Sequence, residues 1–422
     1  MLSARQRQIV SATVPALREH GETITRTFYG DMFAAHPELY NLFNPANQRD
    51  GAQPRSLAAS VLAYAEHIEH PERLGRMVER ISGKHASLEV KAEHYPIVGK
   101  YLLGAITRVL GPAATPEILD AWGAAYGQLA DVMIGREKEL YDEGAAQPGG
   151  WRDFKPFRVE RKEVESEVMT SFYLVPEDGV PPPAFKPGQY VSVKVRPPGY
   201  PYEQIRQYSI SCAPNGRHYR ISVKREDAPA RAPGVAPGLV SNHLHGAVGV
   251  GDSLLVHVPQ GDFVLDETSD RPVVLLSGGA GVTAVLSMLE HLAGPAGGSR
   301  EVLFLRGVRS RARHPFAGHV RALAGLRPGI RGVVLYERVG PDDVQGVHYD
   351  AVGRTTADAL RAYLPEREAD FYYCGPQGFM TAAETALDGL GVPLERRYSE
   401  SFAPDPSFAA DAPVPAPQAR AS

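Results

Sequence analysis

One histidine in the first third of the chain is a candidate metal ligand. His85 lies in the segment Ile81–Leu88, but a single histidine among 14 is more often a surface or hydrogen-bonded residue than a ligand. Upstream, Gln53 and Leu57 are four residues apart, so they share one face of a helix. Tyr29 adds a phenol hydroxyl, although a core tyrosine is more often satisfied by the backbone. These residues indicate metal chemistry only if the surrounding elements support it.

Two glycine-rich segments follow short apolar runs in the last third of the chain. Val273–Leu276 leads into Ser277–Thr283, and Phe371–Tyr373 leads into Cys374–Met380. Glycines between a strand and a helix let the backbone approach a pyrophosphate at the helix N-terminus. A glycine-rich turn alone is weak evidence for nucleotide binding.

A set of ordered segments between these regions offers further phosphate and ring contacts. Arg206-Gln207-Tyr208-Ser209 follows Pro187–Tyr190, and Gly238–Leu244 comes next. The fork of a guanidinium group suits a phosphate. Each segment alone is a weak signal, but their order along the chain is a strong one.

The hydrophobic pattern divides the chain into three folded regions. From about residue 3 to 142 apolar residues recur at helical spacing, as in Ile24, Phe28 and Met32. From Trp151 to about 262 the period changes to two, which predicts antiparallel strands. From Pro272 short apolar runs alternate with helical stretches, the pattern of a parallel sheet with crossover helices. We therefore expect an all-α domain at 1–147, an antiparallel β-barrel at 151–264, an α/β parallel-sheet domain at 270–404 and a disordered tail at 405–422.

Composition limits the possible partners and location. The 422 residues are too many for one ordinary core, and 43% of them are hydrophobic. A formal charge of -4 gives no basic surface for nucleic acid, and no apolar run is long enough to span a bilayer. Two cysteines and no signal peptide favour the cytoplasm, and we expect a monomer. Residues 228–238, rich in Ala, Pro and Gly, predict a surface loop.

The helical region resembles the globin domain of flavohaemoglobins. The matching segments around His85 are Tyr29, His36–Leu39, Phe43 and Asn47–Arg49, together with Gln53 and Leu57. The resemblance implies haem b with His85 as the proximal iron ligand and Phe43 packed on the porphyrin. It places Tyr29, Gln53 and Leu57 in the distal pocket. It also implies that Tyr95 and Glu137 hydrogen-bond toward the ligand histidine, and that Lys84 and Glu400 belong to the catalytic set.

The remaining two regions resemble the ferredoxin-reductase family. There the arginine, here Arg206, pairs with the FAD pyrophosphate, and Tyr208 and Ser209 hold the isoalloxazine. The other FAD contacts implied are Tyr190, Gln207 and Ser241. The implied NAD(P)H contacts are Gly278, Gly279, Ala280, Gly281, Val282, Thr283, Cys374, Gly375 and Pro376. The closing segment comprises Ser401, Phe402, Ala403 and Pro404, with the Phe402 ring over the flavin face.

The chain departs from this family pattern at four positions. Val282 and Ala284 stand where glutamine and proline would flank Thr283, and Ser401 and Ala403 stand where cysteine and glycine are expected. We still expect the glycine turn to bind phosphate. The changes affect the geometry expected for the nicotinamide.

The combined resemblance implies a nitric oxide dioxygenase. Electrons would pass from NAD(P)H to FAD to haem, and nitric oxide and O2 would be converted to nitrate. The alternatives are a haem- and flavin-dependent peroxide or alkyl hydroperoxide reductase, an oxygen-binding or sensing globin, and a flavin reductase with a vestigial haem fold. The choice between NADH and NADPH stays open. Arg306, Arg309, Arg311 and Arg313 could read a 2'-phosphate, but we expect them to form a solvated basic loop.

Overall fold

The computed structural model describes residues 2–228 and 234–402. The chain forms two compact units, of which the first contains Met1–Glu143 and Pro201–Ile205 and the second contains Gly144–Tyr200 and Arg206–Ala403. The first unit holds the N-terminal helices, and the second holds two sheets.

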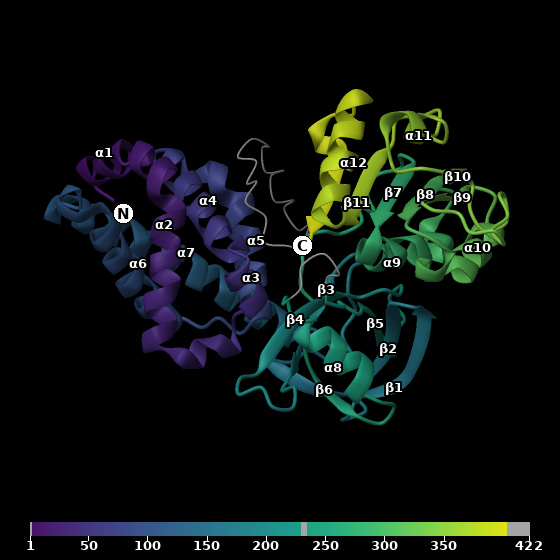
Figure 1. Cartoon of the computed structure of the whole chain (residues 1–422), viewed down its shortest axis with the longest axis horizontal. Helices are drawn as coiled ribbons and strands as arrows, with labels where there is room; N and C mark the ends of the chain where they lie inside the picture. The colour runs from purple at the N-terminus through teal and green to yellow at the C-terminus, as the bar shows by residue number, and fades with distance from the viewer. Residues whose placement is uncertain (1, 229–233, 403–422) are drawn as a thin grey trace, which may run out of the picture. The chain divides into compact units, whose positions relative to one another are not determined.

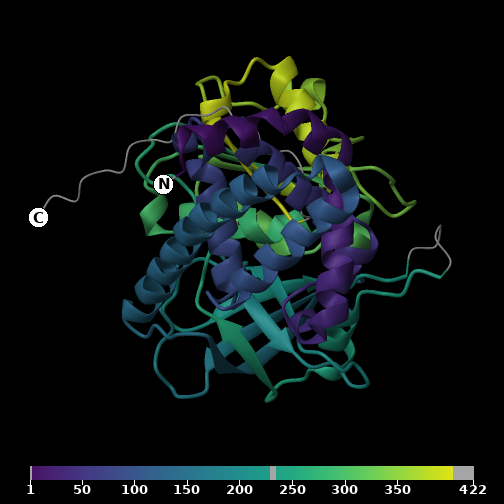
Figure 2. The same ribbon diagram turned by 90° about the vertical axis from the view of Figure 1, so that its left-hand side faces the viewer.

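Helices build the first unit, as the purple and blue ribbons show (Figure 1 and Figure 2). Their bounds are α1 Ala4–Ala12, α2 Val14–Ala35, η1 Pro37–Asn41, α3 Pro45–Arg49, α4 Ala52–Glu66, η2 Pro71–Leu74, α5 Gly75–Ser87, α6 His94–Leu110, η3 Gly111–Ala113 and α7 Pro116–Ala146. The side chains that recur at helical spacing, Ile24, Phe28 and Met32 among them, are buried in one core.

Local signals set the helix ends in this unit. Ser3 caps α1 in a capping box with Gln6. Helix α2 ends at Ala35 because Pro37 follows, and the chain continues as the short η1 helix. Gly51 adopts a left-handed conformation directly before α4, which a glycine reaches without steric cost.

The first sheet of the second unit is antiparallel. Its strands are β1 Phe154–Ser166, β2 Met169–Pro176, β3 Tyr190–Val195, β4 Gln204–Ser209, β5 Tyr219–Lys224 and β6 Ser253–His257, and helix α8 spans Leu239–Ala247. The strand order is β4-β3-β6-β1-β2-β5. Ile210, directly after β4, pairs with Ile221 on β5, so the two outer strands meet and the sheet closes into a barrel.

The second sheet is parallel, with the order β10-β9-β8-β7-β11-β12. Its strands are β7 Val273–Gly278, β8 Val302–Val308, β9 Ile330–Tyr336, β10 Ala351–Val352, β11 Asp370–Gly375 and β12 Arg397–Ser401. The accompanying helices are η4 Gly279–Gly281, α9 Val282–Ala293, η5 Pro295–Gly297, η6 Arg311–Arg313, α10 Ala317–Leu326, α11 Ala357–Arg361, α12 Gln377–Gly389 and η7 Leu394–Arg396.

Helices cover both faces of this parallel sheet. Val273 and Leu275 of β7 pack in one core with α9 and α10, whereas Val274 and Leu276 pack in another with α11 and α12. Successive residues of a strand point to opposite faces, so the continuous apolar run follows from burial on both sides.

The predicted fold class is confirmed: a helical region, an antiparallel barrel and a doubly covered parallel sheet follow one another along the chain. Residues 234–237 of the predicted surface loop are exposed. Residues 229–233 of that loop and the predicted disordered tail at 405–422 lie outside the described residues. Among the described residues, none of the helices has the length and hydropathy needed to cross a membrane.

Candidate functional site

Three helices of the first unit bring His85, Tyr95 and Glu137 together. His85 lies in the last turn of α5, Tyr95 in the first turn of α6 and Glu137 on α7. His85 Nδ1 is 2.8 Å from Glu137 Oε1 and 3.2 Å from the Tyr95 hydroxyl, and that hydroxyl donates to Glu137 Oε1 at 2.5 Å. The sequence-predicted proximal group is therefore one hydrogen-bonded cluster.

The cluster defines how the imidazole can act. The Glu137 side chain is 3% exposed, and its carboxylate can only accept, so His85 Nδ1 is the donor of this hydrogen bond. Nε2 makes no hydrogen bond to any described residue, and the His85 side chain is 34% exposed. Burial and the Glu137 carboxylate raise the pKa of Tyr95, which keeps its phenol as a donor. This donor set fits a neutral imidazole ligand of iron.

Tyr126 is a member of this group that sequence analysis missed. Its hydroxyl donates to the Tyr95 backbone oxygen at 2.6 Å, which holds the first turn of α6 against α7. A Cβ at Gly99 would lie 2.6 Å from the Tyr126 ring, so the glycine leaves room for it. Only this three-dimensional contact identifies Tyr126, since its spacing from Tyr95 forms no recognisable motif.

The predicted distal residues gather around Tyr29 on α2. Tyr29 is 6% exposed, and its ring lies 5.8 Å from that of Phe43 in an edge-on arrangement. Burial raises the pKa of Tyr29, and a hydrogen bond with the Gln53 side chain lowers it by less. The phenol is therefore neutral and keeps its proton. Leu57, one turn further along α4, packs against the same core.

The other two predicted catalytic residues lie in different units. Lys84 precedes His85 on α5, and its backbone oxygen accepts a hydrogen bond from the Ser87 hydroxyl at 2.8 Å. Glu400 lies on β12 of the second unit, in register with Cys374 on β11. A role for either side chain stays a prediction.

Strand β4 carries the residues predicted to hold FAD: Arg206, Gln207, Tyr208 and Ser209. Arg206 and Tyr208 share one face of the strand, because side chains alternate. Burial lowers the pKa of Arg206 and raises that of Tyr208. The Ser209 hydroxyl is buried and has no hydrogen-bond partner in the described part of the chain. A desolvated cation and an unsatisfied hydroxyl on one strand fit a bound dinucleotide.

Two further residues predicted to contact FAD, Tyr190 and Ser241, lie at the starts of β3 and α8. Tyr190 begins β3, and a Cβ at Gly261, which has a φ of +117°, would lie 3.0 Å from its ring. Ser241 lies in the first turn of α8, where its hydroxyl accepts from the Glu226 amide at 3.2 Å and donates to the Gly238 oxygen at 3.3 Å. Ser241 therefore ties Glu226 to the start of α8.

The glycine turn lies between β7 and α9. Gly278 ends the strand, Gly279–Gly281 form η4 with Ala280 at the centre, and Val282 and Thr283 begin α9. Among the described residues no side chain caps this helix. The Thr283 hydroxyl donates to the Ala280 oxygen at 2.9 Å. Uncapped amides at a helix N-terminus suit an anionic group.

Close packing explains the glycines of this turn. A Cβ at Gly281 would overlap the Cys374 backbone oxygen, and Cβ atoms at Gly278 and Gly375 would lie 2.7 and 2.5 Å from the Phe379 ring. The two loops predicted to bind the coenzyme are thus in direct contact.

The remaining residues predicted to contact the coenzyme or the flavin lie at the ends of β11 and β12. Cys374 is fully buried, and burial raises the pKa of its thiol well above the ordinary value, so it is neutral. Pro376 directly precedes α12, and Phe402 is 48% exposed. The Ser401 hydroxyl is buried with no partner among the described residues. Ala403 and Pro404 lie outside the described residues.

The expectation that Arg306 belongs to a solvated basic loop is wrong. Arg306 is not solvated: it is 2% exposed and donates to the Pro315 oxygen at 2.6 Å. Its position on β8 directs it into the core between the sheet and α10. Arg309 and Arg311 are exposed, as a basic loop requires.

Comparison with known proteins defines the class. Residues 26–133 match the globin family, and residues 275–385 match the oxidoreductase NAD-binding domain family. The chain is therefore a globin joined to an oxidoreductase of the NAD-binding type. A flavohemoprotein of Deinococcus radiodurans is 61% identical over 409 residues, which cover 97% of this chain and 99% of that relative. The chain belongs to the flavohaemoprotein family.

Solved structures agree with this assignment. The flavohemoglobin of Malassezia yamatoensis, crystallised with bound FAD and heme, is 29% identical with a TM-score of 0.80, covering 95% of this chain and 99% of its own. The flavohem-like FAD/NAD-binding domain of nitric oxide dioxygenase from Vibrio cholerae O1 biovar El Tor is 41% identical with a TM-score of 0.52 and covers 60% of this chain and 99% of its own.

Proposed function

We propose that this chain is an NAD(P)H-dependent nitric oxide dioxygenase, with haem b, FAD and NAD(P)H as cofactors. The observation that carries the proposal is the His85–Tyr95–Glu137 cluster. A carboxylate bonded to a ligand imidazole raises its basicity and favours activation of O2 over reversible storage. The Vibrio cholerae protein that resembles the second unit is named a nitric oxide dioxygenase. A storage globin has no need of the attached reductase.

The residues of the first unit would bind the haem and polarise O2. His85 Nε2 would hold the iron while Glu137 and Tyr95 keep the ring oriented. Tyr29, positioned by Gln53, would donate a hydrogen bond to O2 where negative charge develops during its reduction. Phe43 and Leu57 would supply apolar walls that exclude water.

The residues of the second unit would bind the electron carriers. Arg206 would pair with the FAD pyrophosphate, and Tyr208 and Ser209 would contact the flavin ring. The α9 amides would hold the coenzyme diphosphate. When bound, FAD converts the two electrons of a hydride into single electrons that haem iron can accept.

Steady-state turnover tests the proposal. The purified protein with NADH, O2 and nitric oxide should form one nitrate for each nitric oxide consumed and oxidise one NADH for every two. Nitrate, NADH and nitric oxide are measured on one preparation, and hydrogen peroxide and an alkyl hydroperoxide serve as competing substrates. Faster NADH oxidation with a hydroperoxide than with nitric oxide would favour the hydroperoxide reductase alternative.

Arg206→Ala should weaken FAD binding by about tenfold to over a hundredfold. The variant removes a charge-assisted hydrogen bond to phosphate, which is worth about 1.5–3 kcal/mol. Flavin retained after dialysis measures the effect. Arg217→Ala is the matched control, because Arg217 is an exposed barrel arginine paired with Glu160. Equal flavin occupancy in both variants would remove Arg206 from the FAD site.

A further inference from the structure

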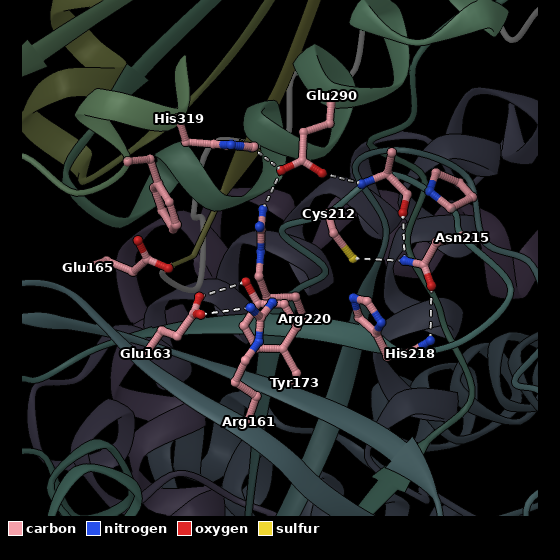
Figure 3. Close-up of a pocket in the computed structure, with 13 residues that line it drawn as sticks. Arg161, Glu163, Glu165, Tyr173, Cys212, Asn215, His218, Arg220, Glu290 and His319 are labelled. Atoms are coloured by element: carbon pink, nitrogen blue, oxygen red, sulfur yellow. Dashed lines mark hydrogen bonds and ion pairs between the residues drawn. The ribbon is translucent and has the colours of Figure 1, made fainter. Parts of the chain in front are cut away.

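A polar cluster links the barrel to the parallel-sheet part within the second unit (Figure 3). Arg220 on β5 donates to Glu290 Oε1 at 2.6 Å, and His319 Nε2 lies 2.7 Å from the same oxygen. Glu290 Oε2 accepts the Ala213 amide at 2.9 Å. We call Arg220, Glu290 and His319, with the Ala213 amide, the clamp. None of these residues belongs to the predicted cofactor sites.

On one side the clamp is rigidly tied to the glycine turn. Thr283, Ser287 and Glu290 follow one another at helical spacing on α9, so they share one face of that helix. Ser287 adds a second bond to the barrel, since its hydroxyl donates to the Cys212 oxygen at 2.7 Å. At about 1.5 Å per residue, Glu290 lies only about 10 Å along the helix from Thr283.

On the other side the clamp is tied to the flavin strand. Ala213 and Cys212 follow Ser209, the last residue of β4, by only a few residues. Ser211 also accepts from Arg220, at 3.1 Å from the guanidinium Nε. The segment directly after the FAD strand is therefore bonded to the coenzyme helix at two adjacent points, by Ser287 at Cys212 and by Glu290 at Ala213, and only Glu290 also pairs with Arg220 and His319.

Stability alone does not account for this arrangement. The side chains of Arg220 and Glu290 are 8% and 14% exposed, and a buried ion pair is often no more stable than an apolar pair of the same volume. A cavity of about 470 Å³ lies beside the clamp, lined also by Glu163, Glu165 and Tyr173 (Figure 3). The cavity interrupts side-chain packing beside the clamp, so the directed hydrogen bonds add orientation to the apolar contact that Met169 of β2 makes with the core around α9.

We propose that Glu290, held by Arg220 and His319, is a positioning residue for hydride transfer. It sets the angle of α9 on the barrel, and so the approach of C4 of the dihydronicotinamide to N5 of the flavin. In that step the C4–H bond breaks, the hydride carries both electrons to N5, and oxidised nicotinamide and reduced flavin remain. This inference rests on the proposed function only because it requires FAD and NAD(P)H. Nitric oxide and O2 take no part in the hydride step.

Glu290→Gln tests the clamp in the full-length holoprotein. The carboxylate accepts hydrogen bonds on both oxygens, but an amide can accept on only one, so one contact is lost with little change in volume. The rate of flavin reduction at saturating NADH, measured anaerobically by stopped flow, should fall at least tenfold. The NADH dissociation constant should change less than twofold. Hydrogen exchange of the Ala213 amide should accelerate, because it loses its acceptor.

Two further variants separate positioning from stability. Arg220→Met with Glu290→Leu removes both buried charges, so its Tm should approach that of the wild type while flavin reduction stays slow. Glu160→Gln, the control, breaks an exposed ion pair inside the barrel and should leave both readouts unchanged. A wild-type rate of flavin reduction in the double variant would overturn the positioning role. The same rate in Glu290→Gln, measured together with faster Ala213 exchange, would also overturn it. Unchanged Ala213 exchange in Glu290→Gln would overturn the contact itself.

Discussion

His85→Ala should yield a protein that retains its FAD but loses nearly all of its haem. His85 differs from the other carboxylate-paired histidines of the first unit because its Nδ1 partner, Glu137, is buried and is also bonded by Tyr95. Its removal deletes the one bond that we expect between the protein and the iron, and leaves only apolar contacts with the porphyrin. Glu137 would also keep a buried carboxylate without its imidazole partner, which adds a cost in stability.

The Soret absorbance per flavin of the purified variant measures this loss. His70→Ala is the matched control: His70 also lies near a carboxylate, Glu72, but its side chain is 62% exposed. His85→Gly with added free imidazole should recover the Soret band, because imidazole can replace the missing side chain. Full haem content and unchanged turnover in His85→Ala would show that another residue binds the iron.

Tyr29→Phe should speed O2 release from the reduced haem-loaded protein by about tenfold to over a hundredfold. The change removes a hydrogen-bond donor to a ligand that carries negative charge, which is worth about 1.5–3 kcal/mol. The ring remains, so the contacts with Phe28, Phe33 and Phe43 are kept. Nitric oxide consumption at low O2 should fall accordingly.

Three rates on one preparation separate the outcomes: O2 release, nitrate formation and flavin reduction by NADH. Flavin reduction should not change, because the residues involved belong to the second unit. Tyr64→Phe is the control, since its buried hydroxyl in the same core donates to the Ala125 backbone oxygen at 3.0 Å. An unchanged rate of O2 release would exclude Tyr29 as a distal donor. Faster release with unchanged nitrate formation would mean that O2 retention does not limit turnover.

The sequence alone determined the fold class, because each region repeats its burial pattern many times. Helical spacing around Ile24, Phe28 and Met32 indicates one buried helix face, and these side chains are in the core. The run Val273–Leu276 is apolar throughout because helices cover both faces of its strand. Such patterns depend on near neighbours in the chain, so they can be read without the tertiary structure.

Contacts between distant side chains were decided only by the tertiary structure. From the sequence, Glu137 could equally be an exposed helix charge, but the packing of α5, α6 and α7 buries it against His85 and Tyr95. Arg306 lies in a basic stretch yet is buried, because β8 turns it toward the core. Arg220 and Glu290 have no spacing that would pair them. Hydrogen bonds and ion pairs depend on distance in space, and one-dimensional periodicity carries no information about which helices or strands meet.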